Sequence, residues 1–160
     1  MAVPSNEALV SLAGLESLQE VGGALSLRRH RHLASIEALA SLTAVGASVS
    51  LRENDDLTTL AGLDGLTAIG GELLVYANDD LMAMSGLGGV ASVAGDLTVD
   101  GNRSLTSLTG LDAVTTVGGT LSILDNDALT TVSGLDGVRT VGSLSIGGND
   151  SLTRLSTLGG

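Results

Sequence analysis

A repeat of 24 residues runs through almost the whole chain and limits what it can fold into. One slot of the repeat holds asparagine in every copy but one, and the last step is 23 residues long. The slot residues are Asn6, His30, Asn54, Asn78, Asn102, Asn126 and Asn149. A unit this short cannot enclose its own core, whereas stacked units bury a continuous one. We therefore expect a single repeat domain over residues 1–160, with repeats that start at 6, 30, 54, 78, 102, 126 and 149.

Aliphatic residues fill fixed columns of this repeat. They stand three, six, nine, twelve and fifteen residues after the slot, as Leu81, Met84, Leu87, Val90 and Val93 do after Asn78. The spacing of three fits tight corners and a short helical turn near the Gly-Leu step. Pairs of glycine then follow in several repeats, and we expect them to form bends with positive φ.

An alternating segment after the glycine pair completes each repeat, as in Leu121 and Ile123, and alternation is typical of a strand. These features together predict an all-β fold. It is a right-handed parallel β-solenoid, similar to a leucine-rich repeat, of about six and a half 24-residue coils with short helical turns at the corners.

Composition excludes several classes of protein. Hydrophobic residues make up 43% of the chain, yet Tyr76 is its one aromatic residue and it has no cysteine. A disulfide-stapled miniprotein and a thiolate metal site are therefore excluded. The net charge of −11 disfavours nucleic acid as a partner. The chain contains no run of 18 apolar residues, so membrane insertion is not expected. Its first residues do not have the pattern of a signal peptide.

Nothing in the sequence predicts catalysis. The chain has two histidines, both in one bend, and it contains no nucleophile elbow, Walker loop or zinc-binding helix. We expect a protein that is not an enzyme and that needs no cofactor and no metal.

The repeat resembles that of the receptor L domain, the leucine-rich-repeat-like β-helix of the insulin and epidermal growth factor receptors. The match is clearest over residues 121–129, followed by Gly134-Leu135, Val138 and Val141-Gly142. Similar domains occur in fungal cell-wall proteins and in bacterial surface proteins. The animal domains carry disulfides and buried aromatic residues that this chain lacks, so the bacterial variants are the nearer comparison and hormone binding is not carried over. All seven basic residues are arginine, which suggests a GC-rich bacterial gene.

The resemblance implies a non-enzymatic binding module of a surface or secreted protein, with this chain a fragment of it. It also implies an extracellular or cell-surface location, to which the cytoplasm is the alternative.

The outward residues of the alternating segments are the candidate binding site. One outward column changes in kind from coil to coil, and Leu74 stands beside it. The candidate residues are Arg28, Arg52, Leu74, Tyr76, Asp100 and Leu124. Such variation indicates either a face fitted to a protein or glycan, with Tyr76 as an anchor, or an unconstrained surface.

A basic cluster in the second coil is a candidate anion site. Arg28, Arg29 and Arg31 lie within four residues, and Arg52 is expected one coil above Arg28. The cluster predicts binding of a phosphate, a sulfated glycan or an acidic partner. The alternative is charge balance against acidic neighbours such as Glu53.

The asparagine column is expected to be structural. Stacked Asn54, Asn78, Asn102 and Asn126 would satisfy backbone groups at the bends. Acidic pairs follow two of these slots, at Asp55-Asp56 and Asp79-Asp80, and they predict either calcium between coils or solvated bends.

The ends suggest a second function. No capping helix is visible at either end of the repeat, and uncapped coils expose strand edges. The alternative hypothesis is therefore a structural solenoid that self-associates through its ends.

Overall fold

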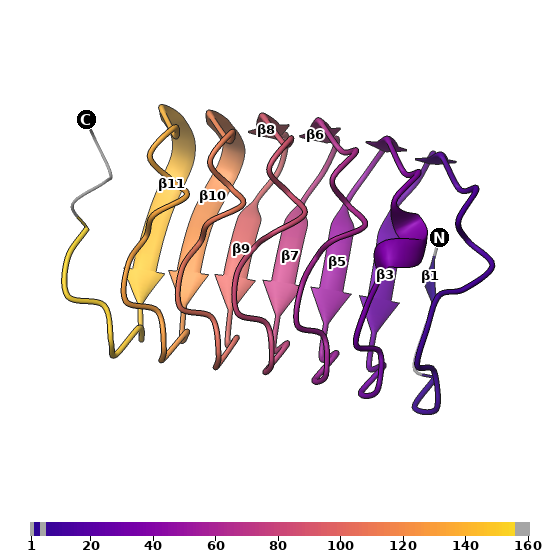
Figure 1. Ribbon diagram of the computed structural model, residues 1–160. Coiled ribbons are helices and arrows are strands. Elements are labelled where there is room, and N and C mark those ends of the chain that lie inside the picture. The colour runs from indigo at the N-terminus through magenta and orange to yellow at the C-terminus, as the bar shows by residue number, and fades with distance from the viewer. Residues whose placement is uncertain (1, 4–5, 156–160) are drawn as a thin grey trace.

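The chain folds into a parallel β-solenoid, in which the coils stack side by side along one axis (Figure 1). The computed structural model describes residues 2–3 and 6–155. One long row of strands runs along the stack: β1 (Ala2–Val3), β3 (Leu25–Arg28), β5 (Val49–Arg52), β7 (Leu73–Tyr76), β9 (Leu97–Asp100), β10 (Thr116–Leu124) and β11 (Thr140–Gly147). A second row consists of shorter strands: β2 (Glu20–Val21), β4 (Ala44–Val45), β6 (Ala68–Ile69) and β8 (Ser92–Val93). At its end, β8 pairs with the first residues of β10.

The register confirms the period predicted from the sequence. Leu25 pairs with Val49, and the same 24-residue step recurs from β5 to β10 before a 23-residue step to β11. The solenoid has about five turns, fewer than the six and a half expected.

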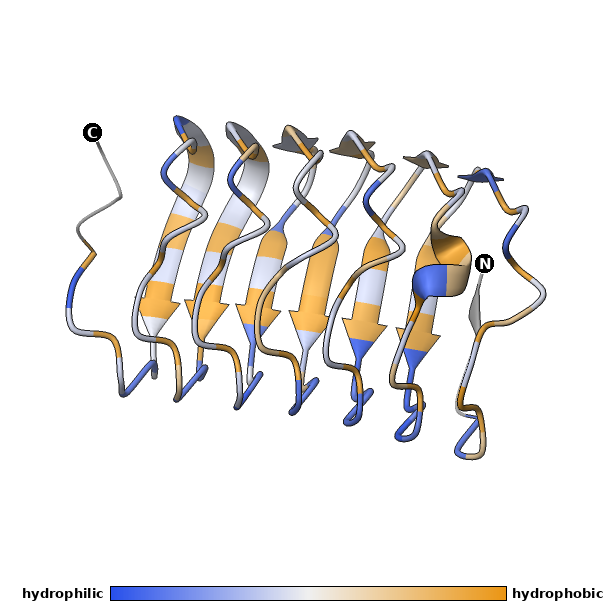
Figure 2. Ribbon diagram, in the orientation of Figure 1, coloured by the Kyte–Doolittle hydropathy of each residue, from blue (hydrophilic) through white to orange (hydrophobic). Residues whose placement is uncertain are grey.

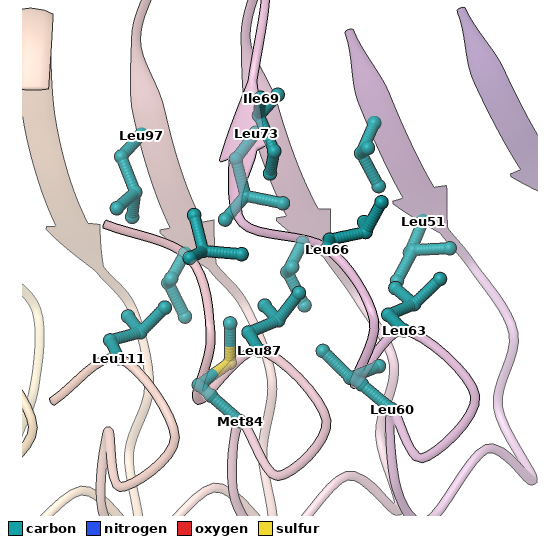
Figure 3. Close-up of a cluster of buried hydrophobic side chains, with 14 of the residues drawn as sticks. Leu51, Leu60, Leu63, Leu66, Ile69, Leu73, Met84, Leu87, Leu97 and Leu111 are labelled. Atoms are coloured by element: carbon teal, nitrogen blue, oxygen red, sulfur yellow. The ribbon is translucent and has the colours of Figure 1, made fainter. Parts of the chain in front are cut away.

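Hydrophobic residues recur in every strand of the long row from β3 to β11 (Figure 2). Their side chains and those of the turns fill the interior, as Figure 3 shows for part of the stack. Each alternating strand points two side chains inward, as β7 does with Leu73 and Val75, and both are fully buried. The columns spaced by three also turn inward, so Leu60, Leu63 and Leu66 pack beside the strand residues (Figure 3). Each buried aliphatic side chain contributes about 1.5–3 kcal/mol to the stability of the fold. The core needs no aromatic side chains, because the same aliphatic columns repeat at every coil.

The spacing of three arises from successive tight turns. The Leu63 N–H donates to the Leu60 carbonyl and the Leu66 N–H donates to the Leu63 carbonyl, at 3.1 and 3.0 Å. The turns confirm the predicted corners. Among the described residues, however, they become helical only in η1 (Glu37–Leu39), not in every coil.

One residue explains where that helix forms. Five other coils place glycine with positive φ eight residues after the slot, at Gly14, Gly62, Gly86, Gly110 and Gly134. The second coil has Ala38 at this position, and alanine is strained at such a φ. The chain forms the 3-10 turn of η1 there instead.

The glycine pairs do not have the predicted positive φ. Gly70 and Gly71 do not have positive φ, whereas the glycine eight residues after the slot, which is followed by leucine, does. The pairs allow close approach between coils, because a Cβ on Gly70 would overlap the Gly46 carbonyl of the preceding coil.

We expect Gly86→Ala to destabilise the protein by about 2 kcal/mol, from overpacking and backbone strain. Its φ is +106°, and a Cβ would overlap the Leu60 carbonyl group. Gly88→Ala is the matched control, since nothing lies within 4 Å of its added Cβ and its φ is not positive. Urea unfolding followed by circular dichroism measures both. Equal stability of the two variants would contradict the role assigned to this glycine.

The asparagine column forms the predicted structural ladder. Asn54, Asn78, Asn102 and Asn126 are fully buried, and each Oδ1 accepts the backbone N–H of the slot residue one coil earlier. The Asn102 Nδ2 donates to the carbonyls of Val75 and Asp100, both at 3.1 Å. His30 continues the column, since its Nδ1 accepts from the Asn6 N–H at 3.2 Å.

Candidate binding face

The outward side of the long strands brings the predicted binding residues into one face. Strand pairing aligns one row of side chains from β3 to β11: Arg28, Arg52, Tyr76, Asp100, Leu124 and Gly147. A second row lies beside it: Ser26, Ser50, Leu74, Thr98, Ser122 and Ser145. We call these two rows the outward face. All six predicted binding residues lie on it.

Tyr76 and Arg52 form the centre of this face. The Arg52 guanidinium lies 5.4 Å from the centroid of the Tyr76 ring, a cation–π distance. The Arg52 Nε is buried and has no hydrogen-bond partner among the described residues. Leu74 is half-buried in the adjacent row of the same strand. The centre of the face is thus an aromatic and aliphatic surface beside one positive charge.

Most of the basic cluster is paired with carboxylates. Arg29 Nε donates to Glu53 Oε2 at 2.6 Å, and Arg28 lies 3.7 Å from the same carboxylate. Arg31 lies 3.8 Å from Asp55. The hydrogen bond from Arg29, together with the charges of Arg29, Arg28 and Arg52, holds the pKa of Glu53 below its usual value. This geometry favours charge balance over the predicted anion site, and only Arg52 of the four arginines has no such pair among the described residues.

The acidic pairs also contact basic side chains of adjacent coils. Asp55 pairs with Arg31, His32 Nδ1 lies 3.2 Å from Asp56, and Arg103 lies 3.0 Å from Asp79. In the part of the chain that the structure describes, no three His, Cys, Asp or Glu side chains are arranged to hold a metal ion.

A shallow acidic groove of about 480 Å³ runs beside the outward face, where the long strands turn into the asparagine bends. Its wall includes Tyr76 and Arg103, and six carboxylates: Glu53, Asp55, Asp79, Asp100, Asp125 and Asp127. The pKa of Asp100 lies above its usual value, because partial burial disfavours the ionised form and Asp125 adds repulsion. Sequence reasoning missed this groove, although the 24-residue spacing of its acidic residues could have revealed it.

No protein-family model, no curated protein and no solved structure matches the chain. The described residues contain no helix long and apolar enough to cross a bilayer.

Proposed function

We propose that this chain is a non-enzymatic binding module, similar to a receptor L domain, which presents its outward face to a protein or glycan. In this proposal it forms part of a larger surface or secreted protein, outside the cell. The observation that carries the proposal is the contrast between the two sides of the same strands. The inward side repeats aliphatic residues at every coil, whereas the outward row runs from arginine through tyrosine to aspartate and leucine.

The chemistry of the face supports recognition. Tyrosine and arginine are common anchors of interfaces, and here the two stack on each other at the centre of the face. Flanking hydroxyl groups of Ser50 and Thr98 can accept and donate hydrogen bonds to a polar partner. A rigid parallel sheet holds all of these groups in register, which lowers the entropic cost of binding.

The test is a triple substitution of the face, Arg28→Ser, Arg52→Ser and Tyr76→Ser. All three side chains point away from the core, so we expect the fold to persist. Binding to an array of immobilised glycans, and then to a panel of purified proteins, should fall at least tenfold, because loss of an interface anchor costs about 2 kcal/mol or more.

A control variant, Glu20→Ser with Arg139→Ser, changes one exposed charge of each sign elsewhere on the solenoid and should bind as the wild type does. If the triple variant binds every ligand of the wild type unchanged, the outward face is not the binding site.

One observation supports the alternative of association through ends. In β11, Leu144 occupies an inward column but is 52% exposed, whereas Leu121 at the same position of β10 is fully buried. A strand edge with exposed aliphatic residues can pair with another coil. Leu144→Lys should abolish any association that uses this edge, and it leaves the outward face unchanged.

A further inference from the structure

The charges beside and on the outward face are distributed about one strand, β7. Arg52 lies on β5, on one side of β7, and Asp100 lies on β9, on the other side. Neither has an ion-pair partner among the described residues. In the adjacent bends, Arg29 and Arg31 lie near β3, where they already pair with Glu53 and Asp55 of the same chain. Asp125 and Asp127 lie after β10.

Such a distribution is complementary to itself under a twofold rotation. Consider two copies with their outward faces together and a twofold axis between them, parallel to β7. This axis reverses the order of coils but keeps the direction of the strands, so each row faces the same row of the second copy. β7 then faces β7, β5 faces β9, and β3 faces β10. A closed twofold interface of this kind is the commonest form of homodimer.

Opposite charges meet at four positions in this arrangement. Arg52 faces Asp100 of the second copy, across the row that holds Tyr76. In the bends, the same operation brings Arg29 opposite Asp125, Arg31 opposite Asp127, and Asp55 opposite Arg103. Asp79 faces its own copy, but Arg103 of the same chain already neutralises it at 3.0 Å.

The second row, which carries no charge, is also symmetric about β7, whereas in the first row Arg28 faces Leu124. Leu74 and Tyr76 lie on the axis, so each meets its own copy and buries apolar surface. Ser50 faces Thr98, and Ser26 faces Ser122, which places hydroxyl groups against hydroxyl groups. The second row therefore reads the same in either direction: small and polar, then leucine, then small and polar.

We propose that the outward face binds a second copy of this chain, in a twofold dimer centred on β7. The proposal rests on the proposed function, since it names the partner of the same face. A cation from the second copy would lie beside Asp100, whose ionised form burial and Asp125 disfavour in the single chain. The buried Nε of Arg52 would gain a carboxylate near its guanidinium.

The size of the face sets the expected affinity. Six strands about 4.8 Å apart, with their adjoining bends, give a face of roughly 25 by roughly 20 Å, or about 500 Å². Standard interfaces bury about 800 Å² per partner. The net charge of −11 on each copy also opposes association, although at physiological salt the screening length is about 8 Å and contacting pairs are screened less. We therefore expect a weak dimer, with a Kd of about 10–1000 μM.

Charge reversal across the axis tests the arrangement. Sedimentation equilibrium in 0.15 M salt, from about 10 μM to about 1 mM protein, should show the wild-type mass rising from 15.8 kDa towards twice that value. Arg52→Asp alone and Asp100→Arg alone should each keep the chain monomeric, because like charges would then meet. The double variant should dimerise again. Unchanged thermal melting of the variants verifies that each still folds.

A disulfide provides a second, independent measurement. The chain has no cysteine, so a single introduced thiol reports only its own contact. Leu74→Cys lies on the proposed axis and should form a covalent dimer under mild oxidation. Ser122→Cys lies two strands from β7, which puts it about 19 Å from its own copy, and it should remain monomeric.

Three results would overturn the proposal: a wild-type mass fixed near 15.8 kDa, association that neither single reversal weakens, or a double reversal that stays monomeric. The second would instead indicate the edge at Leu144. If the dimer fails but the triple serine variant still loses a glycan or another protein, the proposed function stands with a different partner. If that variant loses nothing, the proposed function fails as well.

Discussion

Replacing Leu81 by aspartate is expected to unfold several coils of the solenoid. Leu81 is fully buried in the column three residues after the asparagine slot, where Leu57 and Leu105 occupy the same position of the neighbouring coils. Truncating a buried leucine costs about 2–5 kcal/mol, and an unpaired buried carboxylate adds about 3–5 kcal/mol. The sum is comparable to the total stability of a domain, about 5–15 kcal/mol. Circular dichroism during thermal unfolding should show most of the β-signal lost, or a much lower Tm.

The adjacent residue provides a matched control for this substitution. Met82 is 59% exposed, so Met82→Asp places the same carboxylate in water one residue further along the chain. Its effect should stay below about 1 kcal/mol, as for most surface substitutions. Hydrogen exchange should locate the damage of Leu81→Asp in the coils around it, because repeats interact with their nearest neighbours. A melting curve identical to that of the wild type would contradict a buried column at this position.

The interior was predictable from the sequence because the same constraint acts at every coil. Leu57, Leu81 and Leu105 occupy equivalent positions in equivalent surroundings, so packing selects the same residue type each time. The asparagine ladder was predictable for a similar reason, since each amide must bond to the coil before it. The rows of the outward face also followed from the period, because parallel strands in register align residues 24 apart.

The bends were less predictable, because their backbone does not depend on one residue type. The position before each slot is left-handed in successive coils, with φ of 59° at Arg29, 55° at Glu53 and 51° at Ala77. These side chains share no property that indicates positive φ, and the stacked hydrogen bonds of neighbouring coils impose it. The Arg29–Glu53 pair could have been predicted, since its members are 24 residues apart. The sequence alone, however, does not show which carboxylate each arginine contacts, and the side-chain geometry does.

Replacing Asn102 by leucine is expected to cost about 2–6 kcal/mol, although leucine has nearly the same size. The Asn102 Oδ1 accepts the Asn78 N–H at 3.0 Å, and its Nδ2 donates to the carbonyls of Val75 and Asp100. The Asp100 carbonyl would still accept the Ala77 N–H, but leucine would remove the side-chain partner of the Asn78 N–H and of the Val75 carbonyl in a buried bend. Each unsatisfied group costs about 1–3 kcal/mol. Urea unfolding should show the loss, with the midpoint shifted far below that of the wild type.

Asn149→Leu tests whether burial or the number of lost hydrogen bonds determines the loss of stability. Asn149 makes the same kinds of hydrogen bond, accepting from Asn126 and donating to the carbonyls of Ile123 and Gly147, but it is only partly buried. Water can replace its bonds, so we expect a loss of about 1–2 kcal/mol. Equal losses at the two positions would mean that bond number, not burial, determines the stability of the ladder. A negligible loss at Asn102 would mean that aliphatic packing alone holds the coils in register.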